Sequence, residues 1–178
     1  ENFLVDAIVM LYTYGQHAKA AEFQKIARNA YPGRRFAGDL DEFALEELAK
    51  DMAMATYPQA QAAVSAYLWQ ACYWLAIGEL DASATYERVA QRLWKKYMEE
   101  VGNDTQRRRG LPPLGQMKAS AVMFALEEFP PAMAAALRGA MPPEVLAAVE
   151  EQRRLFGEEM KRQQEEYLRQ QQGAAPQL

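Results

Sequence analysis

The sequence is poor in the residues that build disulfides, metal sites and nucleophiles. Its 178 residues include one cysteine, Cys72, and one histidine, His17. A single cysteine excludes an intrachain disulfide, and these two residues are too few for a zinc site made of Cys and His. The glycine-rich phosphate loops, the nucleophile elbow and the zinc-protease helix motif are also missing. We therefore expect no catalytic residue, no metal and no cofactor.

The chain also lacks an excess of positive charge and long apolar runs. Lys and Arg number 20 against 24 Asp and Glu, which gives a formal net charge of −4. Without a global positive field, nucleic acid is not an expected partner. No stretch approaches the roughly 20 apolar residues that span a bilayer. We expect no transmembrane segment and a soluble chain over these residues. The compartment stays open, since sequence preceding Glu1 could anchor or export the protein.

Residues that favour β-strands are scarce. Val, Ile and Thr together number 15, against 32 Ala and 17 Leu. This composition predicts an all-α protein. Apolar residues at steps of three and four, together with capping residues and three Pro-Pro pairs, place the helices. The expected helices cover residues 2–14, 18–30, 40–56, 59–77, 81–101, 114–128, 132–140 and 143–172. We divide the chain into a helical-repeat domain (1–142), an extended charged helix (143–172) and a disordered tail (173–178).

The last expected helix is rich in charges of both signs. Its spacing predicts ion pairs one turn apart, Glu150–Arg154, Glu158–Arg162 and Glu165–Arg169. One face also has coiled-coil spacing, interrupted by Arg and Gln, at Leu146, Val149, Arg153, Phe156, Met160, Gln163 and Tyr167. Two interpretations remain open for this helix. It is either a solvated extension of the domain or a seam through which two copies associate.

The first half of the chain contains an internal repeat. The offset that aligns Gly15 with Gly78 also aligns Ala27 with Ala90 and Ile26 with Val89. Each glycine stands between two apolar helical segments, where it allows the chain to reverse, and small residues allow the two helices to approach. The repeat therefore predicts two helix hairpins that turn at Gly15 and Gly78 and stack side by side.

These hairpins resemble the tetratricopeptide repeat family over about 60 of the 178 residues. The first unit matches the family at Gly15, Ala20, Phe23, Ala27 and Pro32, and the second at Tyr67, Ala71, Trp74, Gly78, Ser83 and Ala90. The chain departs from the family pattern at Ile8, at Lys95, and at Phe23 and Tyr86, which sit one step early. The offset from Gly15 to Gly78 is also nearly twice the family period of about 34, which leaves room for a degenerate middle unit, or half of one.

The resemblance implies a concave face lined by the first helix of each hairpin, which would hold an extended peptide or a partner helix. The corresponding positions here are Asn2, Val5, Val9, Tyr12, Ser65, Leu68, Cys72 and Leu75. Some members of the family grip a C-terminal carboxylate with Lys and Asn on this face, and the side chains of Val5, Val9, Leu68 and Cys72 cannot do so. The alternative is that helices after Pro112 cover this face.

Three further features have competing interpretations. The basic loop Arg107, Arg108 and Arg109 suits an anionic surface or an acidic partner, or braces the acidic 39–51 helix. His17 is a candidate general base, but a solvated turn histidine is the simpler interpretation. Cys72 is expected to be a packing residue rather than a nucleophile.

We conclude from the sequence that the chain is a non-catalytic protein-interaction or assembly scaffold. Two alternatives remain. One is a small helical enzyme or ligand-binding domain that uses His17 and Tyr12. The other is a structural subunit whose inner face is filled by the 114–140 helices.

Overall fold

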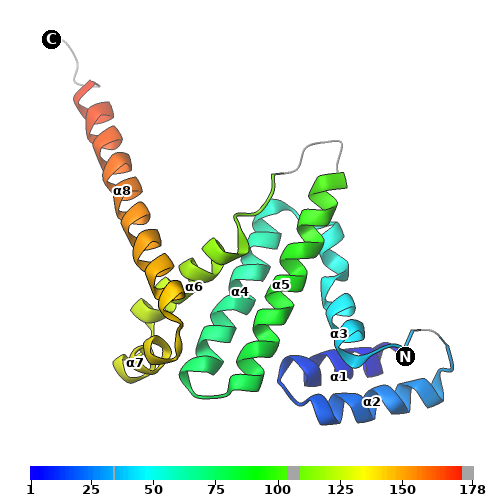
Figure 1. Ribbon diagram of the computed structural model, residues 1–178. Coiled ribbons are helices and arrows are strands. Elements are labelled where there is room, and N and C mark those ends of the chain that lie inside the picture. Colours follow the sequence, from blue (N-terminus) through cyan, green and yellow to red (C-terminus); the bar gives the residue numbers. More distant parts are fainter. Residues whose placement is uncertain (34, 104–108, 174–178) are drawn as a thin grey trace.

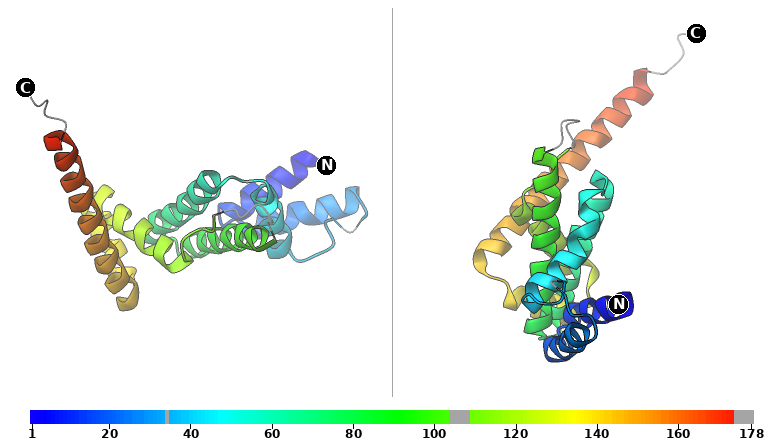
Figure 2. Two further views of the ribbon diagram at one scale, coloured as in Figure 1. Left: turned by 90° about the horizontal axis from the view of Figure 1, so that it is seen from above. Right: turned by 90° about the vertical axis from the view of Figure 1, so that its right-hand side faces the viewer.

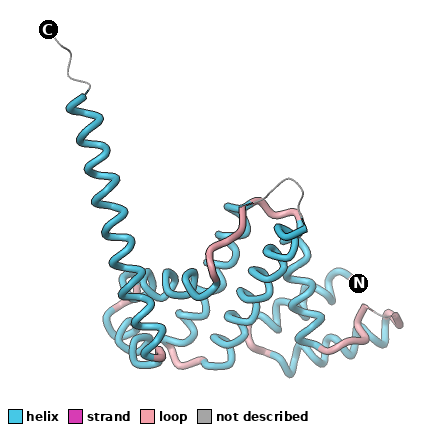
Figure 3. Tube along the Cα trace, turned by 45° about the horizontal axis from the view of Figure 1, so that its top comes forward, coloured by secondary structure: helices cyan, strands magenta, loops and turns pink. Residues whose placement is uncertain are grey.

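The computed structural model describes residues 1–33, 35–103 and 109–173, and every regular element within these ranges is helical (Figures 1 and 3). The all-α prediction is therefore confirmed over this part of the chain. The helices are α1 (Asn2–Thr13), α2 (His17–Ala30), α3 (Leu40–Ala49), the 3-10 helix η1 (Lys50–Ala53), α4 (Tyr57–Ala76), α5 (Leu80–Asn103), α6 (Leu114–Glu128), α7 (Pro131–Ala140) and α8 (Pro143–Gly173). None of these helices combines the length and hydrophobicity needed to cross a membrane.

The two predicted hinges have the same geometry. Gly15 has φ of 71° and Gly78 has φ of 87°, values in the left-handed region that favours glycine. At each hinge the glycine amide donates to the carbonyl three residues earlier, at 2.9 and 3.1 Å. The next amide donates to the carbonyl five residues before it, at 2.9 Å in both cases. This is the Schellman C-cap, and it makes α1–α2 and α4–α5 two hairpins with equivalent turns.

The first hairpin lies crosswise to the second. Figure 1 shows α1 and α2 running crosswise below α3 and beside the lower end of α5, and the right-hand view of Figure 2 shows them nearly end-on while α3 and α5 stand upright. A single helix, α3, lies between the hairpins and packs against both α1 and α5. The chain between the two hairpins therefore contains one helix in place of a helix pair. This is the half unit for which the distance in sequence between Gly15 and Gly78 leaves room.

Local capping signals account for most helix starts. The Asp39 carboxylate accepts hydrogen bonds from the amides of Asp41 and Glu42 and so begins α3. Each Pro-Pro pair stands directly at the start of one of the last three helices. The expected 40–56 helix is wrong at its end. It stops as an α-helix at Ala49 and tightens into η1, because the chain must become extended at Thr56 to cap α4.

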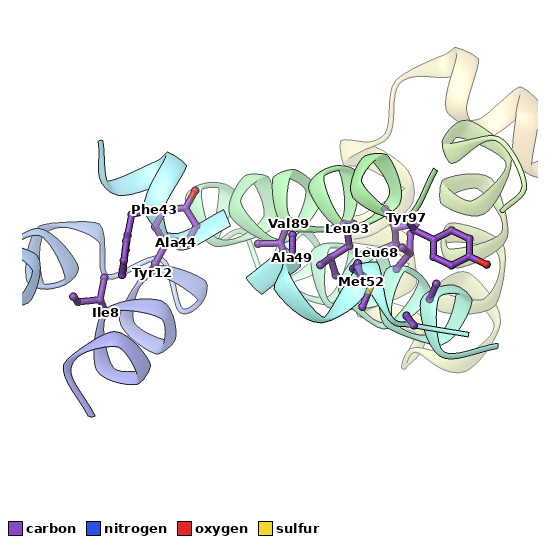
Figure 4. Close-up of a cluster of buried hydrophobic side chains, with 14 of the residues drawn as sticks. Ile8, Tyr12, Phe43, Ala44, Ala49, Met52, Leu68, Val89, Leu93 and Tyr97 are labelled. Atoms are coloured by element: carbon purple, nitrogen blue, oxygen red, sulfur yellow. The ribbon is translucent and has the colours of Figure 1, made fainter. Parts of the chain in front are cut away.

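Two hydrophobic clusters hold the molecule together. The first runs from α1 through α3 to α4 and α5, as Figure 4 shows for Ile8, Tyr12, Phe43, Ala44, Ala49, Met52, Leu68, Val89, Leu93 and Tyr97. The second joins the end of α4 to α6, α7 and the start of α8, and it includes Cys72, Val122, Leu137 and Val149. Helix α4 contributes to both clusters and is therefore the central element of the fold.

Helix α8 is packed only over its first turns. Val149 is buried against the second cluster, whereas Phe156 and Met160 are about half exposed, and the helix then extends away from the body (Figure 1). Of the predicted ion pairs, Glu165–Arg169 forms, at 3.9 Å.

The other two predicted ion pairs of α8 are wrong in their partners. Glu150 contacts Arg153, Arg154 contacts Glu151 and Glu158, and Arg162 contacts Glu159. Arg154 and Arg162 each have an acid at i−4, at i−3 and at i+4, so spacing alone did not select one partner. The helix includes Gly173, one residue beyond its expected end, and the rest of the expected tail lies outside the described residues.

Candidate partner-binding groove

An open groove of about 630 Å³ lies between the first helices of the two hairpins. We call it the aromatic groove. α1 and its C-cap form one wall, α4 forms the other, and α3 and α5 contribute at the ends. Its lining residues are Val5, Asp6, Val9, Met10, Thr13, Tyr14, Glu47, Leu48, Ala66, Tyr67, Gln70, Trp74 and Tyr86. No described residue beyond Tyr86 lines it, so α6, α7 and α8 leave this groove open.

Three aromatic rings from α4 and α5 pack together in this lining. The Tyr86 ring lies 5.8 Å from the Tyr67 ring and is stacked at 6.3 Å on the Trp74 ring, measured between centroids. Burial raises the pKa of both Tyr67 and Tyr86 above the ordinary tyrosine value. Both phenols are therefore neutral at physiological pH, and the groove presents an uncharged aromatic surface there.

The walls of the aromatic groove carry almost no charge. α1 and α4 together contain a single charged residue, Asp6, which is exposed. The second carboxylate in the lining, Glu47, forms ion pairs with Lys50 and with Arg35 at 3.4 Å. Partial burial opposes ionisation of Glu47, but hydrogen bonds from Lys50 and Arg35 outweigh it and lower its pKa. Glu47 is therefore a neutralised carboxylate, whereas Asp6 forms no ion pair within the described ranges.

The structure does not bring the eight predicted partner-binding residues to one surface. Val5 and Val9 line the aromatic groove, Asn2 is exposed at the start of α1, and Tyr12 is fully buried. The four positions from α4 lie elsewhere. Ser65 lines a second hollow of about 550 Å³ between α4, α6 and α8, and Leu68, Cys72 and Leu75 line a smaller one beside α5 and α6.

The α4 positions differ because α6 and α7 pack on the face that the resemblance assigned to a partner. Leu68 and Cys72 are 2% and 4% exposed, so the chain itself occupies that face. The alternative expectation is that helices after Pro112 cover this face. This is what the structure has at Leu68 and Cys72 of α4. The α4 residues that do line the groove are Ala66, Tyr67, Gln70 and Trp74. The aromatic spacing of Tyr67 and Trp74 was a usable signal, but it equally predicts core.

The second hollow is also lined by aromatic rings, and it differs from the aromatic groove in having no carboxylate. Its lining includes the exposed rings of Trp69, Phe124 and Phe156, and no charged side chain. The Phe124 and Phe156 rings meet edge to face at 6.5 Å. This contact joins α6 to the point where α8 leaves the body of the molecule.

The Cys72 thiol is a packing group. Burial raises the pKa of Cys72 to about 12, so the thiolate that a nucleophile needs is not formed at neutral pH. Its neighbours in the second cluster are apolar side chains of α6 and α7.

His17 is not the solvated turn residue that we expected. Its ring stacks on Tyr12 at 5.0 Å, and its Nε2 lies 3.0 Å from the hydroxyl of Thr85, a buried residue of α5. The Thr85 hydroxyl donates to the Asp81 carbonyl at 2.8 Å, which leaves Nε2 of His17 as the donor. His17 thus connects the first hairpin to the second through these contacts. It lines neither the aromatic groove nor the two other hollows.

Only one residue of the predicted basic loop can be placed. Arg107 and Arg108 lie outside the described residues. The Arg109 guanidinium lies 4.8 Å from the centre of the Tyr57 ring, and its carbonyl accepts a hydrogen bond from Tyr97 at 3.0 Å. Arg109 therefore contacts the start of α4. Among residues with defined positions, α3 is braced instead by Arg35 and by Arg92, which pairs with Glu46.

Nothing in the described part of the chain gathers three or more His, Cys, Asp or Glu residues into a possible metal site. The site that stands out is therefore an uncharged, aromatic surface bordered by one free carboxylate. Comparison with protein-family models, with curated proteins and with solved structures gives no match to this chain.

Proposed function

We propose that this protein is a non-catalytic interaction scaffold that holds a segment of a partner protein in the aromatic groove. The observation that carries the proposal is the groove itself, an open hollow between the first helices of two hairpins that is lined by aromatic and aliphatic side chains. Its exposed apolar residues include Met10 and Tyr14, with 61% and 55% of their surface accessible. A contiguous apolar surface with a polar border is typical of protein-binding sites.

We further propose that the hairpins are divergent tetratricopeptide-like units. Support comes from the equivalent Schellman turns at Gly15 and Gly78. The helix ends on either side of one glycine also lie as far along the chain from the corresponding helix ends of the other hairpin as the two glycines lie from each other. α1 ends at Thr13 and α4 at Ala76, and α2 begins at His17 and α5 at Leu80. The crossing of the hairpins and the single α3 between them are the divergent features.

The rival function, catalysis or ligand binding through His17, has less support. His17 and Tyr12 do lie together, and the Asp41 carboxylate acts on the Tyr12 phenol, whose pKa is raised by burial and by this neighbour. The cluster is packed between the hairpins, however, and none of the hollows described above reaches His17. The hollows described above therefore do not offer a substrate access to the His17 ring.

The test is selection of binding peptides from a displayed library of random helical sequences, with the full chain as bait. The decisive variant is Met10→Glu, which places a charge in the groove wall. Its matched control is Met54→Glu, the same exchange at a more exposed methionine outside the groove. We expect selected peptides to lose about 10-fold or more in affinity for Met10→Glu and to keep their affinity for Met54→Glu. Equal losses in both variants, or no enriched peptide, would contradict the proposal.

A further inference from the structure

We infer that the segment held in the aromatic groove is an amphipathic α-helix that places one Lys or Arg against Asp6. This inference rests on the proposed function and names its partner class. It follows from two features of the groove, the distribution of charge along its walls and the helical backbone of those walls, which offers no free edge to pair with.

Charge selects a basic residue in the partner. Helices α1 and α4 together carry one charge, the carboxylate of Asp6, and this carboxylate is exposed and without an ion pair in the described structure. The other acid of the lining, Glu47, is already paired with Arg35 and Lys50. A partner acid near Asp6 would be repelled, whereas a Lys or Arg there gains a charge-assisted hydrogen bond. Asp6 is therefore the one charged contact that the groove offers.

The helical walls favour a helix over an extended peptide. The lining has polar side-chain groups at Asp6 and Gln70 and on the rings of Tyr14, Tyr67, Trp74 and Tyr86, and the Thr13 hydroxyl already donates to the Val9 carbonyl at 2.8 Å. These groups stand on separate side chains and do not form the regular row of donors and acceptors that an extended segment pairs with. The walls are helices, whose backbone groups are bonded internally, and the described residues contain no sheet edge. An extended segment would leave most of its own amides and carbonyls without partners in this groove. A helix satisfies its backbone internally and needs only to bury an apolar face.

The experiment is a second selection from a library with a fixed apolar face. The probe is a displayed helical peptide of about 18 residues, five turns, with polar positions randomised among Lys, Glu, Gln and Ser. The baits are the wild-type chain, Asp6→Asn, Asp6→Lys and Glu22→Lys. The last variant makes the same charge change as Asp6→Lys at an exposed acid of α2, outside the groove.

We expect wild type and Glu22→Lys to enrich Lys at one position of the polar border, and Asp6→Lys to enrich Glu at that position. A synthetic peptide carrying this Lys should bind wild type about 5- to 10-fold more tightly than its Lys→Gln twin. Against Asp6→Asn, the two peptides should bind equally.

The outcomes separate this inference from the proposed function. Peptides that depend on Met10 but show no charge preference at any position would overturn the basic-helix inference and leave the groove as the binding site. A preference for Lys that persists in Asp6→Lys would also overturn it. Failure to enrich any peptide from either library would overturn the proposed function as well.

Discussion

Burial and neighbouring side chains determine the chemistry of several groups in this protein. The thiol of Cys72 and the imidazole of His17 are examples, as are the rings of Tyr67 and Tyr86. Cys72 is 4% exposed, and its pKa is raised to about 12 by burial. His17 lies at the start of α2, where the sequence predicts a solvent-exposed residue, yet it stacks on Tyr12 and donates to Thr85. In each case a neighbour from a distant segment determines whether the group is reactive.

Burial of Cys72 predicts a loss of stability at alkaline pH. The ordinary thiol pKa is 9.0, and the folded value is about 12. Below pH 9 both states keep the proton and the stability is complete. Between pH 9 and 12 only the unfolded chain loses it, so the free energy of unfolding falls with rising pH. By pH 10.5 the loss from this residue should be about 2 kcal/mol.

The measurement is urea unfolding at pH 8, 9 and 10.5 for the wild type and Cys72→Ala. The variant removes the thiol and therefore this part of the pH dependence, while Tyr67 and Tyr86 contribute equally in both proteins. Parallel stability curves for the two proteins would show that Cys72 is not protected as described.

At the scale of elements, the hinges at Gly15 and Gly78 have the same conformation but different surroundings. A Cβ atom built on Gly15 would lie 3.4 Å from the Cα atom of Ala82 in α5, whereas one on Gly78 would meet nothing within 4 Å. The first hinge therefore also serves as a contact between hairpins. The second is an exposed turn whose glycine is required by its positive φ alone.

We expect Gly15→Ala and Gly78→Ala each to lower the free energy of unfolding by about 1–2 kcal/mol, since an L-residue is strained at positive φ. Gly139→Ala is the matched control, because Gly139 lies within α7 and a Cβ there has open space. It should raise stability by about 0.5–1 kcal/mol, because alanine favours the helix. Denaturant titrations of the three variants measure these changes. A neutral Gly78→Ala would contradict the strained-turn assignment.

At the scale of the whole molecule, the core consists of two hydrophobic clusters that both include side chains of α4. The C-terminal part of α8 lies outside both clusters. The side chains from Glu158 to Tyr167 are exposed, whereas Val149 is 1% exposed. The half of the expected coiled-coil seam that includes Leu146 and Val149 is used within the chain itself. Beyond Phe156 the seam continues with the exposed side chains of Met160 and Gln163, a stretch that is short for a stable coiled coil.

We therefore expect a chain ending at Gly157 to unfold within about 2 °C of the full chain, and both to be monomers by light scattering. For the full chain the monomer mass is 20.1 kDa. The control ends at Pro143 and removes Val149 and Leu146, so it should lose stability by several kcal/mol, of the order of two large core truncations. If the full chain has twice the monomer mass and the chain ending at Gly157 does not, the far part of α8 is a dimer seam.

The sequence by itself determined the helices, their hinges and their starts. Glycine at positive φ, Asp39 as an N-cap and the Pro-Pro pairs act within a few residues, so their effects can be read locally. Helix α8 was also predictable, because its polar and apolar positions repeat at helical spacing. The fold class and the two hairpins follow from such short-range signals.

Only the tertiary structure decided which face of α4 is open. A sequence reveals the exposed side of a helix when that side carries charge, and α4 carries none, so its spacing could not separate Leu68 and Cys72 from Tyr67 and Trp74. The packing of α6 and α7 buries the first pair and leaves the second beside α1. The same holds for His17, whose partner Thr85 lies 68 residues away. Contacts between distant segments therefore set the position of the groove, because they choose which of two equally apolar faces is covered.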